Sequence, residues 1–110
     1  MSEQIESVDF YWRPGCGFCM ALDRKLTKMG ILTTKYNIWD HPEHAAFVRE
    51  HANGAETVPT VAVGRQVMVN PSGRQVLATL ESEAPHLIPE GTEVPEAGRI
   101  ARAINRILGE

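Results

Sequence analysis

Two cysteines, Cys16 and Cys19, stand two residues apart between a short apolar run and a helical pattern. They are the only cysteines among the 110 residues of the chain. One turn of a helix brings two such side chains together, so the pair can close a small disulfide ring. At a helix start, the unpaired N–H groups and the positive end of the dipole stabilise a thiolate. The pattern predicts a reactive dithiol at the point where a strand leads into a helix.

A structural zinc site is the main alternative for such a pair. Structural zinc takes four ligands, and this chain has no second cysteine pair. His41 and His44, three residues apart on an expected helix, are the best-spaced histidines to complete a ligand set. Histidines on an amphipathic helix are usually solvated, however, which argues against zinc. A purely structural disulfide is the other alternative, but one that closes so short a loop constrains the unfolded chain little and adds little stability. We therefore expect no metal ligand, and favour redox chemistry over a structural role.

Length and charge narrow the possible partners. A chain of 110 residues with 43% hydrophobic residues can form one domain with its own core. The net charge of −3 argues against binding to nucleic acid, which usually requires a basic surface. There is no apolar run of the roughly 20 residues that cross a bilayer, and the acidic start lacks the features of a secretory signal. We expect a cytoplasmic protein without membrane contact, in which a lone cysteine pair is more often catalytic than structural.

The first half of the chain predicts two strands, each followed by a helix. Residues 8–12 form a short apolar run typical of a buried strand. Residues 16–29 carry an apolar face at helical spacing, and Gly30 is placed to end that helix. Residues 32–38 are rich in β-formers. The second helix is expected to start with Asp40 as its cap, to turn Ala46, Phe47 and Val48 inward and to end near residues 53–54.

The second half predicts a hairpin and a further helix. Residues 58–63 and 66–69 flank a turn at Gly64 and Arg65. Ser72 and Gln75 have the spacing of a capping box for a helix that runs to about residue 83. The order β-α-β-α-β-β-α, with a parallel unit followed by an antiparallel pair, is that of the thioredoxin-like α/β fold with a mixed four-stranded sheet.

The domain is expected to span residues 1–84. Residues 85–95 contain three prolines and predict an irregular connector. Residues 96–110 carry isoleucines and leucine at helical spacing, interleaved with arginines, and predict an extra amphipathic helix packed on the same domain. We expect a monomer.

The positions of the two cysteines suggest different roles for them in catalysis. Cys16, at the helix start, is the candidate nucleophile and is expected to have an accessible sulfur. Arg13 is placed to add positive potential or to bind an anionic substrate. Cys19, one turn into the helix, is the natural resolving thiol, able to attack a mixed disulfide formed at Cys16.

A second informative stretch is Thr57-Val58-Pro59. Its position after two helices favours a cis peptide before the proline. Such a turn would expose the backbone N–H and C=O of Val58, which could pair with an extended thiol substrate like an additional strand.

At these residues the chain resembles the glutaredoxin family. The resemblance rests on residues 11–19, on Thr57-Val58-Pro59 and on their order, and it covers about residues 6–84. It implies that Cys16 is the catalytic thiol, that Cys19 resolves, and that residues 57–59 line the groove for a thiol substrate. It also matches Arg13 to a basic residue that glutaredoxins use against a carboxylate of glutathione.

The resemblance is most specific toward the mycoredoxins. Glutaredoxins commonly have Pro-Tyr between the cysteines and Gly-Gly before the last helix, whereas this chain has Gly17-Phe18 and Asn70-Pro71-Ser72. The motifs Cys-Gly-aromatic-Cys, Thr-Val-Pro-Thr-Val and Asn-Pro-Ser are similar to those of mycoredoxins, which reduce mixed disulfides between proteins and mycothiol. This implies no permanently bound cofactor, a low-molecular-weight thiol (mycothiol or glutathione) as co-substrate, and S-thiolated or disulfide-containing client proteins. The stretch Asn70-Pro71-Ser72 would then take part in substrate binding.

Two other functions are compatible with the same motifs. A dithiol redoxin would use both cysteines and take its electrons directly from thioredoxin reductase. A glutaredoxin-like metal or iron–sulfur binder would hold a cluster through the first cysteine and a small thiol. An intramolecular partner for the first sulfur, Cys19, disfavours the second of these.

Overall fold

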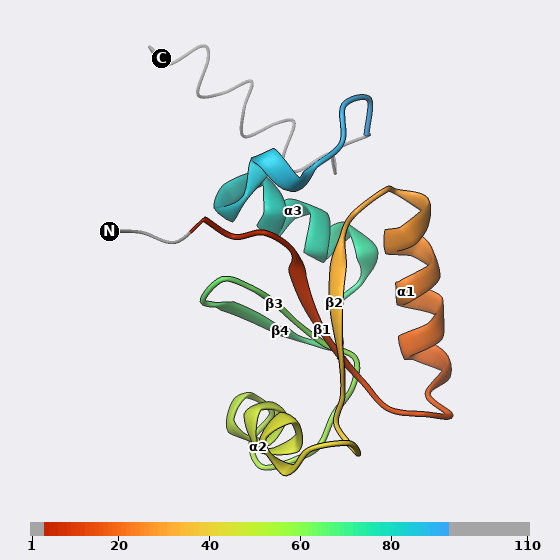
Figure 1. Ribbon diagram of the computed structural model, residues 1–110, viewed down its shortest axis with the longest axis vertical. Coiled ribbons are helices and arrows are strands. Elements are labelled where there is room, and N and C mark those ends of the chain that lie inside the picture. Colours follow the sequence, from red (N-terminus) through yellow and green to blue (C-terminus); the bar gives the residue numbers. More distant parts are fainter. Residues whose placement is uncertain (1–3, 93–110) are drawn as a thin grey trace.

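The strand that leads to the cysteines, β1 (Val8–Trp12), lies inside a four-stranded sheet of order β2-β1-β3-β4. The computed structural model describes residues 4–92 (Figure 1). Strand β2 (Thr33–Asn37) pairs parallel to β1 after a crossover through α1 (Gly17–Lys28). Strand β3 (Thr60–Val63) runs antiparallel to β1 and forms a hairpin with β4 (Gln66–Val69). The expected thioredoxin-like fold, with its mixed sheet, is confirmed.

Alternating side chains of β1 enter two separate cores, because neighbouring residues of a strand point to opposite faces. Val8 and Phe10 are buried against α1 and α3 (Gly73–Glu83) in the larger core. Tyr11 points the other way, into a small cluster with Val48 of α2 (Pro42–His51). Helix α2 therefore lies apart from the other two helices (Figure 1).

The local signals of the second half are reproduced closely. Ser72 caps α3 and forms the predicted capping box with Gln75, through bonds of 3.1 Å and 2.7 Å. Gly64 adopts a positive φ of 61° in the hairpin turn. A short 3-10 helix follows at Pro85–Leu87. The expected helix over 96–110, like residues 93–95 of the connector, lies outside the described residues. No helix within residues 4–92 combines the length and apolarity needed to cross a bilayer.

The start of α2 differs from the sequence expectation. The cap position is His41, without a side-chain cap bond, and Asp40 lies in the preceding turn, where its N–H donates to Asn37. The inward face is formed by Ala45 and Val48, while Ala46 is exposed. The Asp40 cap and the inward position of Ala46 were wrong, whereas Val48 is buried and Phe47 packs against the same cluster, as expected. Ala45 and Val48 are three residues apart and share one face of the helix, which the intervening Ala46 does not.

Candidate redox site

Cys16 occupies the N-cap of α1, with an extended backbone. Its sulfur accepts a hydrogen bond of 3.1 Å from the backbone N–H of Cys19, and its carbonyl accepts one of 3.1 Å from Met20. The two cysteines are joined as a disulfide, with Cα atoms 5.2 Å apart. An N-cap sulfur that faces the unpaired N–H groups of a helix is stabilised as a thiolate once the disulfide is reduced.

Cys16 is less accessible than the sequence suggested. Cys16 is 6% exposed and Cys19 is 2% exposed, and both belong to the larger core. The sulfur of Cys16 lies 3.7 Å from the carbonyl oxygen of Val58, so the loop before β3 covers it. Burial is greatest for Cys19, which points into the domain from the first turn of the helix.

The Val58 loop is held on both sides by hydrogen bonds. Val58 and Pro59 are joined by the expected cis peptide bond. The hydroxyl of Thr60, a fully buried residue, donates to the Thr57 carbonyl at 2.8 Å. The backbone N–H of Asn70 donates to the Pro59 carbonyl at 2.7 Å. The N–H of Val58 itself makes no hydrogen bond within residues 4–92, so one main-chain donor beside Cys16 is left for a ligand.

Asn70, Pro71 and Ser72 are brought next to this loop by the Asn70–Pro59 bond. Asn70 is exposed, with a positive φ of 52°, a conformation that asparagine tolerates better than most residues. Pro71 is buried. The hydroxyl and the N–H of Ser72 are both used by the capping box of α3. Of the three residues, Asn70 is therefore the one whose polar side chain is exposed and takes no part in capping α3.

Arg13 lies in the loop between β1 and the cysteines. Its guanidinium donates to the Pro14 carbonyl at 3.2 Å and lies over the Trp39 ring, 5.9 Å from the centroid. Trp39 is 63% exposed, and Phe18, between the cysteines, is 74% exposed. Sequence reasoning did not single out Trp39, although a large aromatic residue in a polar turn after β2 was a usable signal.

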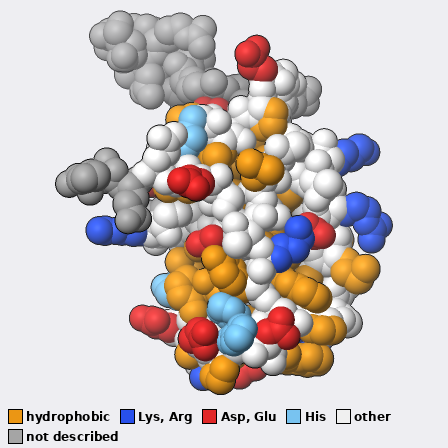
Figure 2. All heavy atoms as spheres, viewed as in Figure 1, with side chains coloured by type: hydrophobic (Ala, Val, Ile, Leu, Met, Phe, Trp, Pro, Cys, Tyr) orange, Lys and Arg blue, Asp and Glu red, His pale blue; other side chains and the backbone are white. Residues whose placement is uncertain are grey.

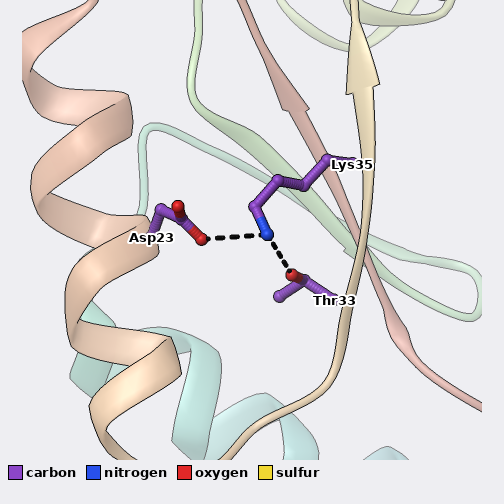
Figure 3. A network of polar contacts seen from close by, with 3 residues as sticks. All are labelled: Asp23, Thr33 and Lys35. Carbon is purple, nitrogen blue, oxygen red and sulfur yellow. Dashed lines mark hydrogen bonds and ion pairs between the residues drawn. The ribbon is translucent and has the colours of Figure 1, made fainter.

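Two further residues near Cys19 were missed. Asp23, on α1, forms an ion pair with Lys35 of β2 at 3.2 Å, and Lys35 also donates to the Thr33 hydroxyl at 3.0 Å (Figure 3). Asp23 follows Cys19 by four residues, a spacing that places both on one side of a helix. That spacing, together with a charged residue inside a strand, was the signal available in the sequence.

Hydrophobic and histidine side chains gather on the surface near α2 (Figure 2), which lies away from α3 (Figure 1). The rings of His41 and His44 meet edge to face, 5.3 Å apart, and His44 also packs on Tyr36 at 4.9 Å. Across residues 4–92, no three His, Cys, Asp or Glu side chains are grouped closely enough to hold a metal ion. The histidines that could have completed a zinc site thus pack among aromatic rings.

Tyr11 anchors this cluster and is electrostatically perturbed. Burial, the nearby Asp9 carboxylate and Tyr36 together raise the pKa of Tyr11 to about 12. Burial also raises the pKa of Asp9 above its usual 3.8. In both cases the neutral form is favoured, because the charged form would lose hydration that the protein does not replace.

A mixed four-stranded sheet with a Cys-x-x-Cys disulfide at the start of α1 defines a thiol redox protein of the thioredoxin-like fold. Residues 8–68, more than half of the chain, match the family model described as Glutaredoxin. The chain belongs to the glutaredoxin family and is, at this general level, a thiol–disulfide oxidoreductase.

Solved structures agree with this assignment. NrdH-redoxin from Escherichia coli, described as a glutaredoxin-like protein with a thioredoxin-like activity profile, is 26% identical with a TM-score of 0.51, over 58% of this chain and 82% of that one. Glutaredoxin from Brucella melitensis (23% identity, TM-score 0.54) is matched over 84% of this chain and 98% of that one. A mutant of the thioredoxin-like protein BC3987 is 14% identical, with a TM-score of 0.58, over 72% of this chain and 99% of that one. The last two support the fold alone. No curated protein is similar enough in sequence to count as a match.

Proposed function

We propose that this protein reduces mixed disulfides between client proteins and a low-molecular-weight thiol, with mycothiol as the physiological thiol. The observation that carries the proposal is the position of the Cys16 sulfur. It lies at a helix N-terminus, 3.1 Å from a backbone N–H, and 3.7 Å from the carbonyl of a loop whose neighbouring N–H is unpaired. Once the disulfide is reduced, a thiolate at Cys16 would therefore lie beside a main-chain edge on which a substrate can dock.

In the first step, the Cys16 thiolate attacks the sulfur of the small thiol in the mixed disulfide. The old S–S bond breaks, and its electron pair leaves on the client cysteine, which is released as a thiol after taking a proton from solvent. Cys16 now holds the small thiol. The Val58 N–H and C=O would align the substrate as an additional strand, and Arg13 would attract an anionic group on it.

In the second step, another molecule of the small thiol, or Cys19, attacks the new mixed disulfide and frees Cys16. Attack by Cys19 closes the Cys16–Cys19 disulfide, which must then be reduced by two electrons. The first route needs only Cys16, and the second needs both thiols.

The choice of mycothiol rests on the Asn70-Pro71-Ser72 turn. In the glutaredoxins that the chain resembles, a Gly-Gly turn lets glutathione approach the backbone, and here a buried proline and a serine that caps α3 replace it. The side chains of this turn occupy the space through which glutathione would approach the backbone, which favours a different thiol. The exposed amide of Asn70 can form hydrogen bonds with the sugar hydroxyls of mycothiol. We further propose that the protein acts as a monomer in the cytoplasm.

A second function has its own support. The likeness to NrdH-redoxin, whose activity profile is described as thioredoxin-like, favours a dithiol redoxin that thioredoxin reductase reduces directly. In that case both cysteines are needed in every cycle, and no small thiol takes part.

The deciding experiment supplies one reduced protein with three alternative electron sources. These are mycothiol with its reductase, glutathione with its reductase, and thioredoxin reductase with NADPH. Turnover of a mycothiol mixed disulfide with the first system supports the proposal. Turnover with thioredoxin reductase alone would replace it with the dithiol redoxin.

A further inference from the structure

Trp39 lies at the same edge of the sheet as the loop that leads to the redox cysteines. Strands β1 and β2 are neighbouring and parallel, with Trp12 opposite Asn37 at their carboxyl ends. The loop after β1 leads to Cys16, and the turn after β2 carries Trp39. The two loops are joined directly, since the Ile38 N–H donates to the Trp12 carbonyl at 2.9 Å. Ligands commonly bind beyond the carboxyl ends of parallel strands, because the loops that follow the strands meet there.

The backbone of this turn holds Trp39 outside the core. The Trp39 N–H donates to the side-chain oxygen of Asn37 at 2.9 Å, and the Asp40 N–H donates to the Asn37 carbonyl at 3.0 Å. Ile38, the preceding residue, is 3% exposed and fixes the turn from the core side, whereas Trp39 is 63% exposed. The turn therefore presents a large apolar ring to water, where the ring gains nothing from burial.

Arg13 covers one face of the Trp39 ring and leaves the other face free. Its guanidinium carbon lies 5.9 Å from the ring centroid, and its Nη1 donates to the Pro14 carbonyl at 3.2 Å. An indole covered on both faces would not be 63% exposed. Within residues 4–92, no aromatic ring packs on Trp39. The ring is held from one side, which lowers the entropy cost for a ligand that binds on the other.

The Arg13–Trp39 pair also lies close to Cys16. Gly15 directly precedes Cys16, and a Cβ atom at Gly15 would be 4.0 Å from the Arg13 Nη1. A thiol joined to the Cys16 sulfur can therefore reach the pair when it carries a bulky group beyond its own sulfur.

We propose that the free face of Trp39 binds the sugar ring of the low-molecular-weight thiol while this thiol is joined to Cys16. Trp39 would then be a further binding residue for the thiol, a role that rests on the proposed function. The C–H groups of a sugar ring carry partial positive charge and pack on the negative face of an aromatic ring. The contact also removes apolar surface from water. Glutathione is a peptide thiol without such a ring, so Trp39 would favour mycothiol over glutathione.

The test uses the reduced full-length protein and two mixed disulfides of nitrothiobenzoate, one with mycothiol and one with glutathione. The Cys16 thiolate bonds to the sulfur of the small thiol, and nitrothiobenzoate leaves with the electron pair of the broken S–S bond as a coloured thiolate. Because no client protein is present, a contact between Trp39 and a client cannot affect the rate. For Trp39→Ala we expect the second-order rate constant to fall by about tenfold with the mycothiol disulfide and to change by less than about twofold with the glutathione disulfide.

Two variants complete the design. Trp39→Phe keeps an aromatic face and should retain most of the wild-type preference for mycothiol. Leu32→Ala removes a similarly exposed apolar side chain before β2, at the opposite end of that strand from Trp39. It should match wild type with both disulfides.

The outcomes separate the sugar contact from the proposed function. A wild-type preference for mycothiol that survives in Trp39→Ala would overturn the contact and leave the proposed function intact. Equal slowing of Trp39→Ala with both disulfides would also overturn the contact, since Trp39 would then act on Cys16 or on the fold. Wild type that reacts no faster with the mycothiol disulfide than with the glutathione disulfide would overturn the choice of mycothiol, and the contact with it.

Discussion

The backbone N–H of Cys19 lies 3.1 Å from the sulfur of Cys16 and donates to it. The first residue of the Cys-x-x-Cys pair is thus the helix cap, and the second supplies the donor that satisfies it. Serine or aspartate usually performs this capping role. With a cysteine in that position, the capping hydrogen bond stabilises the thiolate of the reduced protein relative to the neutral thiol. The start of α1 therefore contributes directly to the reactivity of Cys16.

Cys16 should be the more reactive thiol of the reduced protein. We expect iodoacetamide at about pH 6.5 to alkylate Cys16 at least tenfold faster than an ordinary thiol, whose pKa is about 8.5. Mass spectrometry of the modified peptide measures which cysteine reacts. Cys19 labelled first, or both cysteines labelled at the rate of a free thiol, would contradict the N-cap account.

Thr60 should control the geometry of the substrate loop. Thr60→Val keeps the shape but leaves the Thr57 carbonyl without its 2.8 Å hydrogen bond, at a cost of about 1 kcal/mol in the free energy of unfolding. Because Val58 follows Thr57, we also expect a several-fold higher KM for a mixed disulfide, with kcat little changed. Thr60→Ser, which retains the hydroxyl, is the control and should restore KM. A stability loss without any change in KM would limit Thr60 to a structural role.

Tyr11 should make the protein less stable at high pH. The folded-state pKa of about 12 exceeds the usual 10.0, so between these values the unfolded chain releases the Tyr11 proton and the folded chain keeps it. Stability falls as pH rises through this window, by about 2 kcal/mol in all. Denaturant titrations of wild type and Tyr11→Phe at about pH 9 and about pH 12 measure the difference. An equal loss in both proteins would show that other groups cause it.

Ser72 should matter more to stability than to catalysis. Ser72→Ala removes one half of the capping box of α3 and should cost about 1 kcal/mol, measured by chemical denaturation. Because the cap already uses its hydroxyl, we expect KM for the small thiol to stay within about twofold. A KM raised by more than about tenfold would instead place the Ser72 hydroxyl against the substrate.

The features that could be predicted from sequence are those decided by neighbours along the chain. The Ser72–Gln75 box, the Gly64 turn and the Cys16 helix start all depend on residues within a few positions of one another, and each is confirmed. The order of elements followed from the same local signals. Asp40 was a comparable local signal that failed, since the Asn37 carbonyl already engages its backbone N–H in a turn.

Contacts between distant segments could not be predicted in this way. The burial of Cys16 depends on the carbonyl of Val58, 42 residues later in the chain. The Asp23–Lys35 pair joins a helix to a strand, and the aromatic stack at α2 joins Tyr11 to Phe47 with ring centroids 4.6 Å apart. Each depends on how the elements pack, which single-residue patterns do not encode. The family resemblance indicated Cys16 and Cys19 but not the Asp23–Lys35 ion pair.

The most direct test is reduction of a mycothiol mixed disulfide and of its glutathione counterpart by wild type and by Cys19→Ser. We predict a preference for mycothiol, with the Cys19→Ser variant still turning over, because Cys16 alone can exchange with a small thiol. Cys16→Ser, the matched control at the other cysteine, should be inactive with both substrates. Activity with neither substrate, together with efficient reduction of wild type by thioredoxin reductase and NADPH, would contradict the account and make the protein a dithiol redoxin.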